Sequence, residues 1–196
     1  MRIIFSGLIV ILFLLSNSAN SSEFPDKISI YFTSSNYFSL LDKINNDNSA
    51  IINEKYKKYM KVAISYNYNG KKKFKNAKAR ITGQYKDHIK QFESSLKISI
   101  PNGNISGNKT FKLLLLNTRN GSNEIFWTIL MKELNYLAPY SKIVDVSIND
   151  RQSYKAIFQE DIDEVFLEKN NFRNSPIIKI DQRQIFHNRF FSGDQK

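Results

Sequence analysis

The chain has 196 residues, 41% of them hydrophobic, and its 29 basic residues exceed its 18 acidic ones, which gives a net charge of +11. This length suits one domain with a sizeable core and is short for two. The charge favours anionic partners such as phosphates, acidic proteins, nucleic acid or a membrane surface, with a merely solvated basic face as the alternative. The lack of cysteine excludes disulfides, thiolate metal sites and a lipoprotein anchor.

The first 21 residues have the pattern of a signal peptide. Arg2 supplies a positive charge, residues 3–15 form an uncharged apolar run, and small residues at 19–21 suit a signal peptidase. Because the run is short for a membrane span, we expect export to the periplasm, the cell surface or the medium. An uncleaved membrane anchor is the alternative. Residues 22–181 are expected to form the domain and residues 182–196 a polar tail.

The first half of the domain is expected to be a sheet. Alternating apolar residues predict strands at residues 27–33, 59–68 and 71–82. Asn69-Gly70 lies between the last two strands and is the favoured two-residue turn of a hairpin. Residues 37–56 are rich in Asn and Ser and are expected to form a loop, with room for a helical turn at residues 38–44.

Residues 111–134 organise the second half. Four consecutive leucines predict a strand covered on both faces, and polar residues 117–123 separate it from an amphipathic helix. Glu124 lies in the first turn of that helix, after Ser122 or Asn123 as N-cap. The apolar residues that recur at helical spacing are Phe126, Trp127, Leu130, Met131 and Leu134. Other strands are expected at residues 94–100, 109–116, 142–148, 154–158 and 176–180, and a second helix at residues 161–169.

These elements predict an α+β fold, in which a mainly antiparallel sheet made of hairpins packs against one amphipathic helix. Most catalytic signatures are absent, including a P-loop, a dinucleotide fingerprint, a nucleophile elbow and an HExxH motif. His88 and His187 are too few and too far apart to predict a metal site. For His88, which lies between Gly83 and a predicted strand, an ordinary polar loop position is favoured over a catalytic one.

Four segments, in order along the chain, resemble the CotH family of atypical kinases, which were first identified as spore coat proteins. They are KARITGQYKDHI at residues 78–89, SLKISI at 95–100, ISGNKTFKLLLLNTRNGSNEIF at 105–126 and YKAIFQEDIDEVFLEKNNFRNSPIIKID at 154–181. The resemblance implies a fold like the N-lobe of a protein kinase. It also implies binding of ATP with Mg²⁺ or Mn²⁺ and, in complete members, phosphorylation of proteins.

The resemblance also implies roles for particular residues. Lys97 would hold the phosphates and Glu124 would orient Lys97, while Arg119 would meet a phosphate. Lys112 and Glu133 are the alternatives to Lys97 and Glu124. Each residue also has a purely structural interpretation. Lys97 would be an exposed lysine of a strand, and Glu124 would be the acidic residue that the first turn of a helix favours. Arg119 would pair with a carboxylate.

The acidic segment Gln159-Glu160-Asp161 falls where a kinase chain passes between lobes, so Glu160 would lie near nucleotide. The family has an acidic residue at the first of these positions, and Gln159 departs from it. The family's metal-binding and catalytic aspartates lie beyond the part matched here, and Asp194 is the only carboxylate side chain after Asp181. We therefore expect no catalytic residues.

Two functions follow as expectations. The first is an exported CotH-like kinase domain without its catalytic lobe, truncated or inactive, that keeps a site for ATP and a protein substrate. The alternative is a non-enzymatic secreted module that binds an anionic polymer or a cell-surface partner. A nucleic-acid partner is disfavoured, because export removes most such partners and no RNP or helix-turn-helix pattern is present.

Overall fold

The computed structural model describes residues 24–33, 36–172 and 176–178. The chain divides into two compact units, Met1–Asp161 and Ile162–Lys196, and each is described by itself. The expected signal peptide and the expected polar tail lie outside the described residues. Within the described ranges, no helix combines the length and the apolar character needed to cross a membrane.

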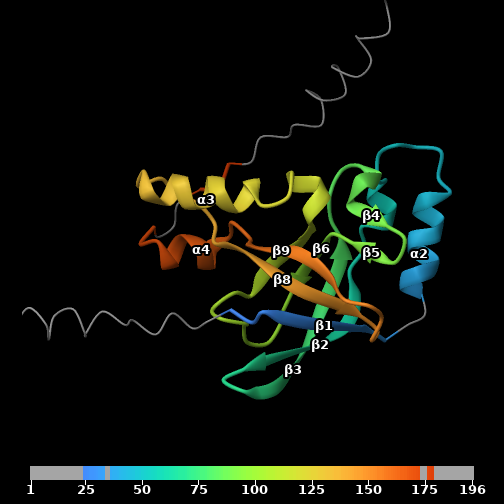
Figure 1. Ribbon diagram of the computed structural model, residues 1–196, viewed down its shortest axis with the longest axis horizontal. Coiled ribbons are helices and arrows are strands. Elements are labelled where there is room, and N and C mark those ends of the chain that lie inside the picture. The colour runs from blue at the N-terminus through green and yellow to red at the C-terminus, as the bar shows by residue number, and fades with distance from the viewer. Residues whose placement is uncertain (1–23, 34–35, 173–175, 179–196) are drawn as a thin grey trace, which may run out of the picture. The chain divides into compact units, whose positions relative to one another are not determined.

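A closed barrel of seven strands forms the centre of the first unit (Figure 1). Around the barrel the strands follow the order β1, β2, β3, β6, β7, β9, β8. The neighbouring strands are antiparallel except for β1 and β8, which close the barrel as a parallel pair. The strands are β1 (Lys27–Phe32), β2 (Met60–Tyr68), β3 (Lys71–Ile81), β6 (Leu96–Ser99), β7 (Thr110–Leu115), β8 (Ser141–Ile148) and β9 (Tyr154–Glu160).

Apolar side chains fill the inside of the barrel, because successive residues of a strand point to opposite faces. Buried residues from all seven strands meet there, among them Ile28, Ile64, Ile81, Ile98, Phe111, Val146 and Phe158. In β7 the outward-facing Leu114 is also only 1% exposed, so the prediction of a strand covered on both faces is confirmed.

The predicted hairpin is confirmed as β2 and β3. Its turn residues Asn69 and Gly70 have φ values of 50° and 70°, the two positive values that this kind of turn requires. The helical turn expected at residues 38–44, within the predicted loop, is confirmed but is longer than expected, because α2 (Asn36–Asn45) is a complete helix. It buries Tyr37, Leu41 and Ile44, whose spacing of four and three residues is a helical signal inside an Asn- and Ser-rich stretch.

The predicted fold class is wrong. The strands form a closed mixed barrel with few helices, not an open, kinase-like N-lobe sheet with a packed helix. The helix α3 (Asn123–Glu133) is present as expected, but Thr128 is its only buried residue. Four of the five side chains expected to pack are exposed, including Phe126 at 60% and Trp127 at 55%, and the fifth, Leu130, is half-buried. The spacing of apolar residues shows that they lie on one face of a helix, but it does not show that another part of the protein packs against that face.

Short elements connect the strands of the first unit. They are three 3₁₀ helices (Glu54–Tyr56, Lys86–His88 and Leu116–Arg119) and a two-stranded sheet of β4 (Ile89–Lys90) and β5 (Glu93–Ser94). In the second unit, α4 (Glu164–Lys169) begins after Asp163, whose side chain accepts a hydrogen bond from the Phe166 amide at 3.1 Å. Residues 176–178 are not in a strand, and the rest of the last predicted strand lies outside the described residues.

Candidate functional site

The β2–β3 hairpin lies within the part of the sequence that carries the net charge. Residues 55–86 include eleven Lys and Arg and no Asp or Glu, whereas the rest of the chain has 18 basic and 18 acidic residues. The excess of +11 therefore belongs to this one segment. Lys71, Lys72, Lys73 and Lys78, all on β3, are exposed. An anion approaching the molecule meets its strongest attraction here.

Acidic side chains do not neutralise the hairpin. Among the described residues, the ion pairs of the basic segment are made by Lys55 and Lys57, which precede β2. Two lysines of the hairpin lie over aromatic rings, with Nζ of Lys72 5.3 Å from the ring centroid of Phe74 and Nζ of Lys73 4.9 Å from that of Tyr68. The Phe74 ring is itself 63% exposed. The hairpin thus presents positive charge beside an aromatic surface.

A second set of cations crosses the outer face of the barrel. Lys97 on β6 pairs in register with Arg80 on β3 and with Lys112 on β7, and Lys112 pairs with Gln159 on β9. Lys97 points away from its buried neighbours Leu96 and Ile98, as the alternation predicted. Three basic side chains therefore lie side by side on three adjacent strands, and we call Arg80, Lys97 and Lys112 the cation row.

Asp161 holds two of these cations. Its Oδ2 pairs with Nζ of Lys97, and its Oδ1 lies 3.1 Å from Nζ of Lys112. The Asp161 side chain is only 5% exposed. Burial disfavours the charged carboxylate, but the two lysines together outweigh that effect and keep the pKa of Asp161 below its ordinary value. Sequence reasoning missed this partner, which lies 64 residues from Lys97.

Glu124 belongs to a different cluster. It accepts a hydrogen bond from Nε2 of Gln159 at 2.6 Å, and its Oε2 lies 4.0 Å from Nη1 of Arg119. Among the described residues, Lys97 thus pairs with Asp161, and the structure does not form the expected pair of Lys97 with Glu124. It does bring Glu124 and Arg119 together. Nε of Arg119 is buried without a partner in the described part of the chain.

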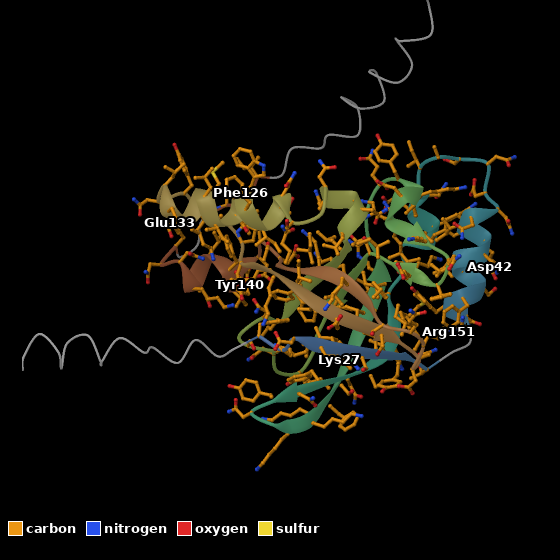
Figure 2. All side chains as sticks on the ribbon, viewed as in Figure 1. Lys27, Asp42, Phe126, Glu133, Tyr140 and Arg151 are labelled. Carbon is orange, nitrogen blue, oxygen red and sulfur yellow. The ribbon has the colours of Figure 1, made fainter. Side chains whose placement is uncertain are left out.

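The remaining predicted residues lie elsewhere. Oε2 of Glu160, at the end of β9, accepts a hydrogen bond from the Tyr140 amide at 2.9 Å. Glu133, the alternative to Glu124, is exposed at the end of α3, where Figure 2 labels it. Neither residue joins the cation row.

His88 has a structural setting. Its Nδ1 lies 2.9 Å from Oγ of Ser95, which in turn accepts a hydrogen bond from the Leu115 amide at 3.0 Å. Burial lowers the pKa of His88, and nearby Asp87 partly opposes this effect. A Cβ on Gly83 would come within 2.1 Å of the His88 ring, so glycine is needed where the loop crosses the ring. Among the described residues, no group of three or more His, Asp or Glu could hold a metal ion.

The molecule thus offers two basic surfaces of different kinds. The hairpin is exposed and has no acidic partners among the described residues, whereas Lys97 and Lys112 are half-buried and share the carboxylate of Asp161. The first suits a large flexible polyanion, and the second suits at most a small anionic group. No protein-family model matches the chain, and a search of curated proteins likewise found no match.

Proposed function

We propose that this chain is a non-catalytic binding module for an anionic polymer, with the β2–β3 hairpin as its main contact surface. The supporting observation is that the whole net charge falls in residues 55–86, while the rest of the chain is balanced. A polymer with repeated negative charges contacts several lysines at once, so individually weak contacts add up.

The aromatic residues of the hairpin support the same proposal. Phe74 is exposed, and Tyr68 lies under Nζ of Lys73 at 4.9 Å from its ring centroid. Exposed rings beside cations give a polymer an apolar contact in addition to charge. A basic face that is merely solvated needs no such rings.

The test compares two variants that lose the same charge. In one, Lys71, Lys73 and Lys75 of the hairpin become Gln; in the control, exposed Lys43, Lys90 and Lys109 become Gln. Binding of dextran sulfate is measured by calorimetry at 50 and 200 mM NaCl. We expect wild-type affinity to fall with salt, because screening weakens contacts between exposed charges.

The hairpin variant should bind roughly 5- to 100-fold more weakly than wild type, if each lysine contributes about 0.3 to 0.9 kcal/mol. The control should bind within about threefold of wild type, since its lysines lie outside the contact surface. Equal losses in both variants would show that only net charge matters and would overturn the assignment of the hairpin. No binding at low salt would overturn the function itself.

A second candidate function is binding of a nucleotide phosphate at the cation row. The row supports it, because Arg80, Lys97 and Lys112 lie on adjacent strands and Asp161 is the carboxylate that pairs with two of them. The resemblance to CotH kinases, which stays a proposal, points to the same lysine. This function does not require a kinase-like fold.

The melting temperature with and without millimolar ATP and Mg²⁺ or Mn²⁺ tests this second candidate. Ligand at 100 times its dissociation constant stabilises a protein by about 2.7 kcal/mol, which raises the melting temperature by several degrees. We expect a metal-dependent rise that Lys97→Ala abolishes and Lys90→Ala leaves intact. The absence of any rise would remove nucleotide binding and leave the polymer proposal untouched.

A further inference from the structure

A polar groove of about 400 Å³ crosses the outer face of the barrel where β1 meets β2 and β8. Its floor is a row of three serines on three adjacent strands. Ser29 on β1 is in register with Ser65 on β2 and with Ser147 on β8. The short side chains hollow this face, and they line the hollow with hydroxyl groups.

Two of the serine hydroxyls are hydrogen-bonded to each other. Oγ of Ser147 donates a hydrogen bond to Oγ of Ser29 at 2.9 Å, which leaves the proton of Ser29 available to a ligand. Ser65 and Ser147 are only 3% and 6% exposed, so the floor is deep rather than a stretch of open sheet. Ser153, which follows the β8–β9 turn, adds a fourth hydroxyl at the wall.

The walls of the groove are mainly positive. Lys27, Lys72 and Arg151 line it, and Asp150 is its one acidic lining residue in the described part of the chain. Asp150 is already engaged, because its Oδ1 accepts a hydrogen bond from the Tyr31 hydroxyl at 2.9 Å. Figure 2 labels Lys27 on β1 and Arg151 after the β8–β9 turn, so the cations come from separate elements.

The β8–β9 turn fixes the place of Arg151. Asn149 and Asp150 have φ values of 48° and 57°, and Oδ1 of Asn149 accepts a hydrogen bond from the Phe32 amide at 2.8 Å. The guanidinium carbon of Arg151 lies 4.0 Å from the ring centroid of Phe38. A stacked guanidinium on an anchored turn loses little freedom when it binds an anion.

We infer that this groove binds one sugar unit that carries an acidic group, as found in an acidic polysaccharide. The serine row suits the hydroxyl groups of a sugar ring, and the cations suit a carboxylate or a sulfate ester. A bare inorganic anion could accept a hydrogen bond from a serine hydroxyl, but it would fill only a small part of the groove. The volume is at the low end for ligand pockets, which run from about 300 to 1,000 Å³, and so suits a single sugar unit.

This inference rests on the proposed polymer binding and makes it more specific, because Lys72 belongs to both the hairpin and the groove. A chain bound along the hairpin would place one unit among the serines. The polymer would then be selected by its sugar and not by its charge alone.

The test uses sodium glucuronate, glucose 6-sulfate and glucose as probes, with binding followed by NMR titration. The groove variants are Ser29→Val, which fills the floor with a residue that strands favour, and Arg151→Gln. The matched control is Ser99→Val on β6, another half-buried outward-facing serine outside the groove. Circular dichroism checks that each variant is folded. If Ser29→Val does not fold, Arg151→Gln decides the test.

We expect wild type to bind at least one acidic sugar with a millimolar dissociation constant and glucose at least tenfold more weakly. Both groove variants should lose at least tenfold in affinity, while Ser99→Val should not change it. A preference for glucuronate identifies a carboxylated polymer, and a preference for glucose 6-sulfate identifies a sulfated one. No binding of either acidic sugar by wild type, or equal binding by the folded groove variants, overturns the inference.

The two proposals can fail separately. The variant with Lys71, Lys73 and Lys75 changed to Gln keeps Lys72 and the whole groove, so it should bind acidic sugars normally while losing dextran sulfate. Dextran sulfate binding without acidic sugar binding would remove the groove and keep the hairpin. The reverse result would keep the groove and remove the hairpin.

Discussion

Asp161 is the residue on which the cation row depends, because it is nearly buried and contacts both Lys97 and Lys112. We expect Asp161→Asn to lower the free energy of unfolding at pH 7 by about 1 to 3 kcal/mol, since two adjacent lysines lose their shared counter-charge. The matched control is Asp145→Asn. Asp145 pairs at 2.9 Å with Lys155 in a more exposed setting, and its loss should cost less than about 1 kcal/mol.

The same substitution has a predicted pH dependence. The pKa of Asp161 is lowered in the folded protein from an ordinary value of 3.8. Its stabilisation is therefore complete above the ordinary value and is lost as the pH falls through the lowered one. Urea unfolding at pH 7, 5 and 3 should show the gap between wild type and Asp161→Asn narrowing only at the lowest pH. A gap that stays constant at every pH would contradict a role through charge.

For single residues, the sequence predicts the direction in which a side chain points better than it predicts which residue that side chain contacts. The outward direction of Lys97 follows from alternation with Leu96 and Ile98, which is a local property of a strand. The first-turn position of Glu124 is equally local. The pairing of Lys97 with Asp161 depends on the register of β6 with β7 and on the register of β7 with β9, which no short window of sequence contains.

The elements differ in how much tertiary structure they need. The β2–β3 hairpin is predictable because Asn69-Gly70 fixes both its turn and its register. The spacing of Tyr37, Leu41 and Ile44 indicates the helix α2, but only the barrel shows what these residues pack against, as where Phe32 stacks on Tyr37 at 4.1 Å between ring centroids. For α3, by contrast, the spacing predicts a packed stripe that the barrel leaves exposed.

Trp127 makes the exposure of α3 measurable, because it is the only tryptophan in the chain. With a residue that is 55% exposed, we expect acrylamide to quench the fluorescence of the folded protein at least half as strongly as that of the urea-unfolded chain. Trp127→Gln should change the free energy of unfolding by no more than about 0.5 kcal/mol, as for most surface positions. Leu41→Ala on α2, whose side chain is 1% exposed, should cost about 2 to 5 kcal/mol. A quench-protected Trp127 would mean that α3 is covered.

For the whole molecule, the decisive feature is the parallel pairing of β1 with β8, which turns an antiparallel sheet into a barrel. Both strands are recognisable in sequence, but their pairing joins positions 118 residues apart, as between Ser29 and Ser147. Alternation shows that each strand has a buried face, but it does not show which strand lies beside it in the sheet. An open sheet and a closed barrel therefore have the same local pattern, and the predicted fold class was wrong for this reason.

Closure can be tested with a cross-link, because the chain has no cysteine to compete. In the double variant Ser29→Cys and Ser147→Cys, the new thiols replace hydroxyl groups whose oxygens are 2.9 Å apart. We expect a disulfide to form on mild oxidation and to raise the free energy of unfolding by about 2 to 5 kcal/mol, since it closes a long loop. In the control pair, Ser99→Cys with Ser147→Cys, the residues lie on strands that are not neighbours, and no disulfide should form within one molecule. If only the control pair cross-linked, or neither did, β1 would not lie beside β8. The barrel would then be open at the strand that forms the floor of the groove, and the serine row would not exist.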